Sequence, residues 1–296
     1  MMMRYFKLFF IPIVPPAPLL ANAEESFNLG KVVATVEKEA VRIMASVTMK
    51  NIFIILYVGA CATYTLAFSL HFTKQRTLER FAAAIGLALN GAVLVAIVLI
   101  SGHLPVFNLF ESLVSAAFIL ACLGLFFTKV ERSLPDVAMW VWIEILLLLV
   151  ISLLFPKVLA SSCYDFNYPY RICFFAFRVG ALSIILFSSA FIIQSRVEGK
   201  NPLSGANRFY QGRNFLLLGT ILFLVSEYSG MVWCQNGWGD MWRWSDGHLQ
   251  SVFIFLYLML AFHIQERRKG PRGIRSLVAG MSGFVMLAFT VIRGLD

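Results

Sequence analysis

The chain has 296 residues, of which 59% are hydrophobic and only 14% are charged, and its net charge is +9. Soluble proteins carry about 45–50% apolar and about 25% charged residues, so this composition excludes a soluble globular domain. Several apolar runs reach the ~20 residues that cross a bilayer, and they do not alternate in the way that β-barrel strands do. We therefore predict an all-α, polytopic membrane helix bundle.

The first 23 residues predict a signal peptide or an uncleaved N-terminal anchor. Arg4 and Lys7 precede an apolar stretch, and Ala-Asn-Ala at 21–23 fits a signal-peptidase site. Prolines, among them Pro15, Pro16 and Pro18, interrupt the apolar stretch, so both interpretations remain open. Residues 24–50 mix apolar and polar positions, which predicts an amphipathic helix on the outer side of the membrane.

Eight apolar runs follow and predict about eight transmembrane helices. They lie at 51–72, 81–101, 106–128, 137–155, 172–194, 214–234, 249–265 and 275–292. The runs contain three ionisable residues that stand out, Glu144, Arg178 and Glu227, and such groups at membrane depth indicate function. We expect Glu227 either to contact a ligand or to pair with Arg178.

Basic residues gather in alternate connections, which the positive-inside rule places in the cytoplasm. This set comprises Lys74, Arg76, Arg80, Lys129, Arg132, Arg196, Lys200, Arg208, Arg213, Arg267, Arg268, Lys269, Arg272 and Arg275. The other connections and the C-terminal tail hold Lys157, Arg171, Arg243 and Arg293. The positive charge therefore indicates orientation in the membrane, not nucleic-acid binding, and it places the segment 233–248 on the outer side.

That segment, WCQNGWGDMWRWSDGH, is rich in tryptophan and predicts an outer loop. Its tryptophans are Trp233, Trp238, Trp242 and Trp244. An aromatic belt at the membrane interface is the plain alternative, but a belt spreads its aromatic residues over all spans. Concentration at one place favours a platform for a large, flat, apolar ligand, and Gly237 and Gly239 permit close approach.

The stretch SGMVWCQNGWGDMWRWSDGH resembles the tryptophan-rich "WWD" signature of the haem-handling family of cytochrome c biogenesis membrane proteins, and within it the CcsA (ResC) branch. The turn SGHLPVFNLFES at 101–112 and the final span GPRGIRSLVAGMSGFVMLAFTVIRGL resemble further parts of that family. The resemblance covers roughly residues 50–296. It implies a haem-handling membrane domain at 51–296 with a WWD-type loop at 230–248, and His103 is expected to stabilise the 101–112 turn.

The resemblance implies a membrane subunit of cytochrome c maturation, which presents haem on the outer face for covalent attachment to apocytochrome c. Such a subunit would form part of a haem lyase (holocytochrome c synthase) complex. The implied cofactor is haem b, bound non-covalently and in transit. The implied partners are a CcsB/ResB-like membrane protein, apocytochrome c with its CxxCH motif, and a thioredoxin-like thiol reductase. The implied location is the bacterial cytoplasmic membrane, with the tryptophan loop on the periplasmic side.

The resemblance also implies roles for individual residues. The haem-binding set is Trp233, Trp238, Gly239, Trp242, Trp244 and Asp246. His263 matches an axial-ligand histidine of the family, and His248 is a second candidate, because imidazole nitrogen binds haem iron. Arg171 stands where the family has its other axial histidine. Because a guanidinium offers no lone pair to iron, we expect Arg171 to contact a haem propionate instead. The plain alternatives are that Arg171 and His263 are ordinary interfacial side chains and that His248 is a solvated loop histidine.

Departures from the family pattern support a second hypothesis. Ser245 occupies the place of the family's aspartate, Asp246 comes one position later, and the first axial histidine is missing. A divergent relative that is not a synthase, and acts as a membrane regulator or assembly factor of haem metabolism, is therefore the alternative. A secondary transporter fits less well, because the sequence lacks the internal repeats typical of that class.

Overall fold

The computed structural model describes residues 29–73, 75–130, 135–155, 168–197, 202–239, 246–264 and 273–293, and these parts contain helices and no strand. The helices are α1 (Leu29–Phe72), α2 (Arg76–Ser101), α3 (Leu109–Val130), α4 (Pro135–Leu154), α5 (Pro169–Val197), α6 (Pro202–Trp238), α7 (Asp246–His263) and α8 (Ile274–Arg293). The prediction of an all-α protein is confirmed. The chain divides into two units, Met1–Met49 and Lys50–Asp296.

The first unit is described only as the beginning of α1. Residues 29–49 are helical, as predicted for part of the 24–50 segment, while its place at the membrane surface stays a prediction. The signal peptide or anchor predicted for residues 1–23 lies outside the described residues. Everything that follows concerns the second unit.

Seven helices are long and apolar enough to cross a membrane. They are Asn51–Phe72, Arg76–Ser101, Leu109–Phe127, Val137–Leu154, Pro169–Val197, Gly205–Gly237 and Ile274–Arg293. The predicted polytopic helix bundle is therefore confirmed, and the protein is an integral membrane protein. The remaining predicted span, 249–265, corresponds to α7, which is apolar but has only 18 residues. At 1.5 Å per residue it extends about 27 Å, slightly less than the ~30 Å hydrocarbon core.

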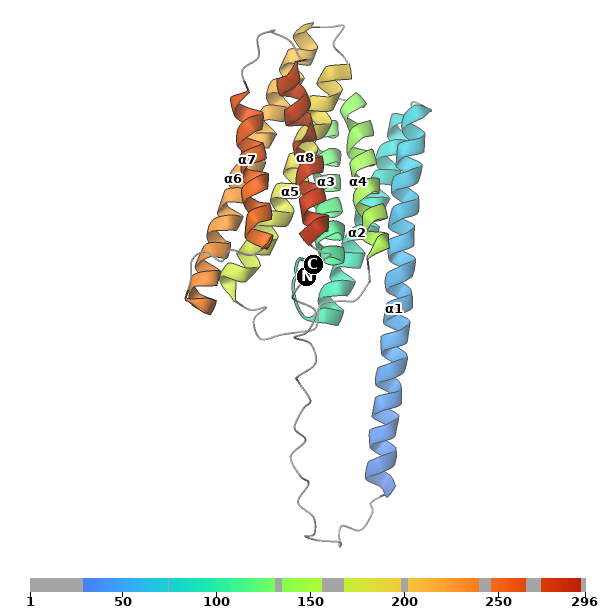
Figure 1. Cartoon of the computed structure of the whole chain (residues 1–296). Coiled ribbons are helices and arrows are strands. Elements are labelled where there is room, and N and C mark those ends of the chain that lie inside the picture. Colours follow the sequence, from blue (N-terminus) through green and yellow to red (C-terminus); the bar gives the residue numbers. More distant parts are fainter. Residues whose placement is uncertain are drawn as a thin grey trace. The chain divides into compact units, whose positions relative to one another are not determined.

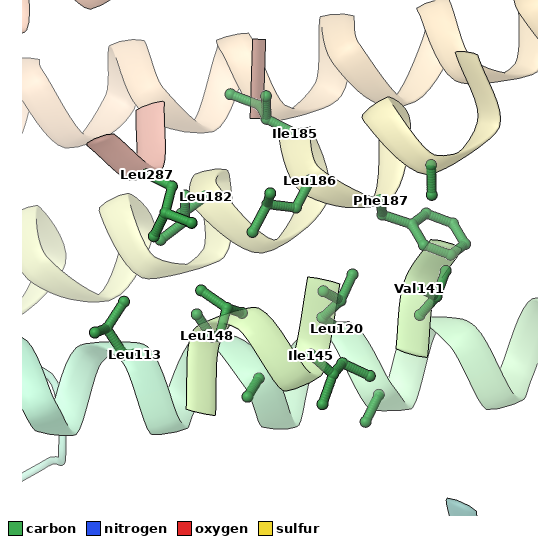
Figure 2. Packing of buried hydrophobic residues seen from close by; sticks show 14 of the residues in the cluster. Leu113, Leu120, Val141, Ile145, Leu148, Leu182, Ile185, Leu186, Phe187 and Leu287 are labelled. Carbon is green, nitrogen blue, oxygen red and sulfur yellow. The ribbon is translucent and has the colours of Figure 1, made fainter. Parts of the chain in front are cut away.

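Helix α5 occupies the centre of the bundle and contacts α3, α4, α6 and α8 (Figure 1). Apolar side chains of these helices interdigitate around it (Figure 2). The labelled examples are Leu113, Leu120, Val141, Ile145, Leu148, Leu182, Ile185, Leu186, Phe187 and Leu287. Many of the remaining large apolar side chains are exposed, as expected where helices face lipid instead of water.

Small residues allow α6 and α8 to approach α5 closely. The backbone N–H of Gly283 in α8 donates to the Ser189 hydroxyl at 3.0 Å, and the Ser188 hydroxyl donates to the Gly212 carbonyl at 2.6 Å. A Cβ atom added at Gly283 would lie 2.8 Å from the Leu186 Cα atom. Close backbone contact of this kind is a main source of helix association in membranes.

Helix α6 is longer at both ends than the apolar run that predicted it. Hydropathy placed this span at 214–234, whereas the helix covers Pro202–Trp238. Hydropathy measures the apolar character of a run, and a helix continues through polar residues as long as its backbone hydrogen bonds are satisfied. The first part of the predicted tryptophan loop is therefore helical. It ends where Gly239 takes a positive φ of 80° and donates its N–H to the Gln235 carbonyl at 2.9 Å, the usual left-handed helix end.

The glycine contacts lead to a stability prediction. We expect Gly283→Ala to lower the melting temperature of the detergent-solubilised protein, because the new methyl group forces α8 away from the α5 backbone, at a cost of about 1–3 kcal/mol. Gly237→Ala is the matched control, since a Cβ atom there has no neighbour within 4 Å. Equal melting temperatures for the two variants would contradict the close α5–α8 packing.

Candidate functional site

One end of the bundle brings together segments that are far apart in the sequence. It is formed by the 102–108 turn, the beginning of α5, the end of α6, the beginning of α7 and the end of α8, and we call it the tryptophan end (the lower end in Figure 1). Four residues that the sequence singles out, Arg178, Glu227, Trp233 and His248, line two cavities at this end, and Arg293 lines both.

The 102–108 turn is folded by the first residues of α3. Glu111, fully buried, accepts hydrogen bonds from the backbone N–H groups of Phe107 and Asn108 at 3.3 and 3.4 Å. The Ser112 hydroxyl donates to a carbonyl of the turn at 2.8 Å. His103 donates from Nδ1 to the carbonyl of the next residue at 2.8 Å, in agreement with its predicted role in the turn. These bonds fix Phe107 and Asn108 at the edge of the larger cavity.

An aromatic cluster surrounds Trp233. The Trp233 ring lies 6.2 Å from the Phe174 ring and 6.3 Å from the Phe175 ring, measured between centroids. The guanidinium carbon of Arg171 lies 5.2 Å from the Trp233 ring and 5.5 Å from the Phe107 ring. Both distances are within the range of cation–π attraction. The structure thus brings Arg171 to the tryptophan that begins the predicted ligand platform.

A buried ion pair lies beneath this cluster. Arg178 donates from Nη1 to Glu227 Oε1 at 2.6 Å and to the Ser251 hydroxyl at 3.2 Å, so one guanidinium joins α5, α6 and α7. Arg178 is only 7% exposed. Pairing with Arg178 was one of the two roles expected for Glu227, and it is confirmed.

A second arginine, Arg293, reaches the same place from the end of α8. Its guanidinium carbon lies 5.2 Å from the Phe174 ring centroid, and that of Arg178 lies 5.5 Å from the same ring. Sequence analysis did not assign Arg293 to the site. The sequence held one unspecific indication, an arginine directly after the apolar run 275–292. Charged side chains are costly near the membrane interior and seldom lack a role there.

The larger cavity has a volume of about 140 Å³ and is lined by Phe107, Asn108, Phe175, Arg178 and Arg293, among others. The smaller cavity, about 40 Å³, is lined by Phe174, Glu227, Trp233, His248 and Arg293, among others. Pockets for drug-sized ligands measure about 300–1,000 Å³. Each cavity therefore accommodates an edge or a substituent of a large ligand, not the whole of it.

The described residues include some of the predicted haem-binding residues. Trp233, Gly239 and His248 lie at the tryptophan end, and Trp238 is the last residue of α6. The side chains of Trp238 and Asp246 lie outside the described residues, as do Trp242, Trp244 and Ser245 entirely.

His263 lies at the opposite end of α7 from this cluster. It is exposed and donates from Nδ1 to the Met259 carbonyl at 2.8 Å. Seventeen helical residues, or about 25 Å of axial rise, separate it from Asp246 at the start of α7. One iron atom at the tryptophan end is therefore within reach of His248 and not of His263.

The side chains at the tryptophan end fit the chemistry of haem. Aromatic faces suit an apolar disc, the imidazole of His248 is a type of group that ligates haem iron, and the guanidinium groups suit carboxylates such as the propionates. Within the described residues there is no group of three or more His, Cys, Asp or Glu that would hold a free metal ion.

Comparison with known proteins gives a consistent but partial match. No protein-family model matches the chain. "Cytochrome c biogenesis protein CcsA" of Arabidopsis thaliana is 30% identical over 70 residues, and that of Cyanidium caldarium is 29% identical over 75 residues. The protein of the same name from Arabis hirsuta is 28% identical over 78 residues. The chain is a distant relative of these proteins.

The matched stretch is short in both partners. It covers 24–26% of this chain and 21–25% of the three relatives, so the chain spans about a quarter of the length of the curated relatives it matches. Identity at this level over so short a stretch supports a relationship. It does not show that this chain and its relatives have the same activity.

The ion pair gives a prediction about stability. We expect Glu227→Gln to destabilise the solubilised protein by about 3 kcal/mol, because it leaves the Arg178 guanidinium buried without its carboxylate. The double variant Arg178→Met/Glu227→Met is expected to cost less than the sum of Arg178→Met and Glu227→Met, because it removes both charges together. Thermal melting of the wild type, these two single variants and the double variant completes the cycle, and additive losses would show that the two side chains do not interact.

Proposed function

We propose that this protein handles haem at its tryptophan end and serves cytochrome c biogenesis. The observation that carries the proposal is the convergence there of Trp233, His248 and three arginines around two cavities. The distant relationship to CcsA proteins supports the same conclusion. In this proposal haem b is cargo, bound non-covalently on its way to a partner protein.

Each group has a separate part in holding such a cargo. Trp233, with the tryptophans of the following connection, offers flat apolar surface, and stacking of ring systems on aromatic side chains is worth about 1–3 kcal/mol per contact. His248 offers an iron ligand and thereby influences the redox state of the iron. Arg171, positioned over the Trp233 ring, offers a charge-assisted contact to a carboxylate.

The proposal includes a location and partners. The tryptophan end faces the outer, periplasmic side of a bacterial cytoplasmic membrane, since the basic residues of the chain concentrate in the other set of connections. A CcsB/ResB-like membrane protein, apocytochrome c with its CxxCH motif and a thioredoxin-like thiol reductase are the proposed partners. The covalent attachment takes place on apocytochrome c within a haem lyase complex.

A second function is supported by a specific observation. Where the CcsA family pattern has an axial histidine, this chain has Arg171, and that arginine lies over the Trp233 ring. With His263 at the far end of α7, the ligand pair of the family pattern is not reproduced at the tryptophan end. A haem-dependent regulator or assembly factor, which binds haem without attaching it, requires no such pair.

The haem-binding part of the proposal predicts a spectrum. Protein purified from haem-replete cells is expected to show a Soret band, which weakens in Trp238→Ala/Trp242→Ala and shifts in His248→Ala. His263→Ala is the matched control and is expected to leave the band unchanged, because His263 lies at the opposite end of α7. The absence of haem from every preparation would refute haem handling, and a shift in His263→Ala alone would assign the ligand to that residue.

The two candidate functions differ in their effect on cytochromes. Deletion of the gene is expected to remove covalently bound haem from c-type cytochromes, measured by haem staining of denaturing gels, while cellular haem synthesis continues. Re-expression of the wild-type chain is expected to restore the stain. Normal staining in the deletion strain would exclude a direct role in maturation and favour the regulator.

A further inference from the structure

Arg178 at the tryptophan end has one hydrogen-bond donor that finds no partner among the described residues. Arg178 uses Nη1 for Glu227 and Ser251, while its Nη2 is buried without a hydrogen-bond partner among the described residues. A buried charged group that leaves a donor unpaired is costly, because nothing replaces the water that it has lost. The guanidinium also lines the larger cavity, so a ligand there is well placed to accept this hydrogen bond.

Arg293 adds a second positive charge to the same cavity. It lines both cavities, and its guanidinium, like that of Arg178, lies over the Phe174 ring. Among the described side chains that line the two cavities, Glu227 is the one carboxylate, and it is already bonded to Arg178. Two guanidinium groups therefore share one carboxylate in largely apolar surroundings.

The beginning of α7 increases this positive potential. A Cβ atom added at Gly247 would lie 3.5 Å from the Arg293 guanidinium carbon, so this arginine lies against the first turn of the helix. The N-terminal end of a helix carries partial positive charge and favours anions. A cation beside it is unfavourable unless an anion also occupies the site.

The rest of the larger cavity suits one end of an amphiphile. Asn108, Ser112 and Thr290 add polar side chains to its lining, and Phe107 and Phe175 form apolar walls. Its volume of about 140 Å³ is comparable to that of an engineered cavity of about 150 Å³ that holds benzene. This space accommodates a carboxylate on a short alkyl arm, with the body of the ligand outside it.

We propose that the Arg178–Arg293 cavity is a carboxylate-binding site that takes a propionate of the haem cargo. This inference rests on the proposed function and adds to it the group by which the cargo is oriented. Arg293 lines both cavities, so a ring system held at Trp233 and His248 has its carboxylate arm directed to the guanidinium pair. Arg171 lies over the Trp233 and Phe107 rings of the same cluster, and a second carboxylate of the cargo would meet it there.

The test compares ligands that differ only at the carboxylates. Protoporphyrin IX and its dimethyl ester are titrated into the purified full-length chain, and binding is followed by quenching of tryptophan fluorescence. Iron-free porphyrin removes any contribution of iron ligation. We expect the wild-type protein to bind the diacid at least ~10-fold more tightly than the diester, as charge-assisted hydrogen bonds are worth a factor of about ten or more.

Substitution of Arg293 identifies the site responsible. Arg293→Gln is expected to weaken diacid binding about 10-fold and to leave diester binding unchanged, and Arg293→Lys is expected to retain part of the preference. Arg275→Gln is the matched control, because Arg275 lies on the same helix over a different ring, that of Phe209, at 5.7 Å. Melting temperatures of all variants report whether they fold.

The possible outcomes separate this inference from the proposed function. Equal binding of diacid and diester by the wild-type protein refutes the carboxylate site and leaves haem handling intact. Binding of neither porphyrin refutes both. If Arg293→Gln weakens both ligands equally, Arg293 supports Phe174 and does not receive the carboxylate. An unchanged preference in Arg293→Gln, with the preference lost in Arg171→Gln, moves the carboxylate contact to Arg171 and refutes the cavity assignment.

Discussion

The tryptophan end depends on one buried guanidinium. Arg178 of α5 bonds to Glu227 of α6 and to Ser251 of α7, and in a bilayer such bonds have little competition from water. Helix α7 is the shortest in the bundle, and its packing is chiefly against α8. The Arg178 bonds hold the beginning of α7 to the end of α6, and so fix both ends of the tryptophan connection. Every proposed contact with a ligand requires that these two helix ends stay together.

Gly230 leaves room for the aromatic ring of Phe174, over which two arginines lie. A Cβ atom added at Gly230 would lie 2.7 Å from the Phe174 ring, so the ring occupies space that any other residue would fill. Both Arg178 and Arg293 lie over that ring, and Trp233 packs beside it. The site is thus a consequence of the same close approach of α5 and α6, through small residues, that holds the centre of the bundle together. The same contacts between α5 and α6 therefore determine both the packing of these helices and the shape of the candidate site.

The sequence predicted the helical class and the spans, because apolar runs are strong local signals. The location of the site, inferred from the clustered tryptophans, stays a prediction. The sequence also predicted the possible partnership of Arg178 and Glu227, since isolated charges at membrane depth need partners. The role of Arg293 was missed, because it depends on α8 ending beside Phe174, and such a contact between distant segments leaves no local pattern. The helical extension to Trp238 was missed for a different reason, namely that hydropathy does not register helix in polar sequence. His263 was named as an iron-ligand candidate by resemblance to the family, and α7 places it at the end opposite to Asp246, so its ligand role stays a prediction.

The distribution of basic residues gives the arginines of the tryptophan end further meaning. The positive-inside rule removes lysine and arginine from the connections on the outer side, and under the predicted orientation few remain there. Two of those few, Arg171 and Arg293, lie with the buried Arg178 around a single aromatic cluster. Orientation in the membrane does not explain basic residues on this side, and among the described side chains that line the two cavities Arg178 and Arg293 face a single carboxylate, that of Glu227. The proposed recognition of an anionic, apolar ligand accounts for both observations, because such a ligand supplies negative charge while it is bound.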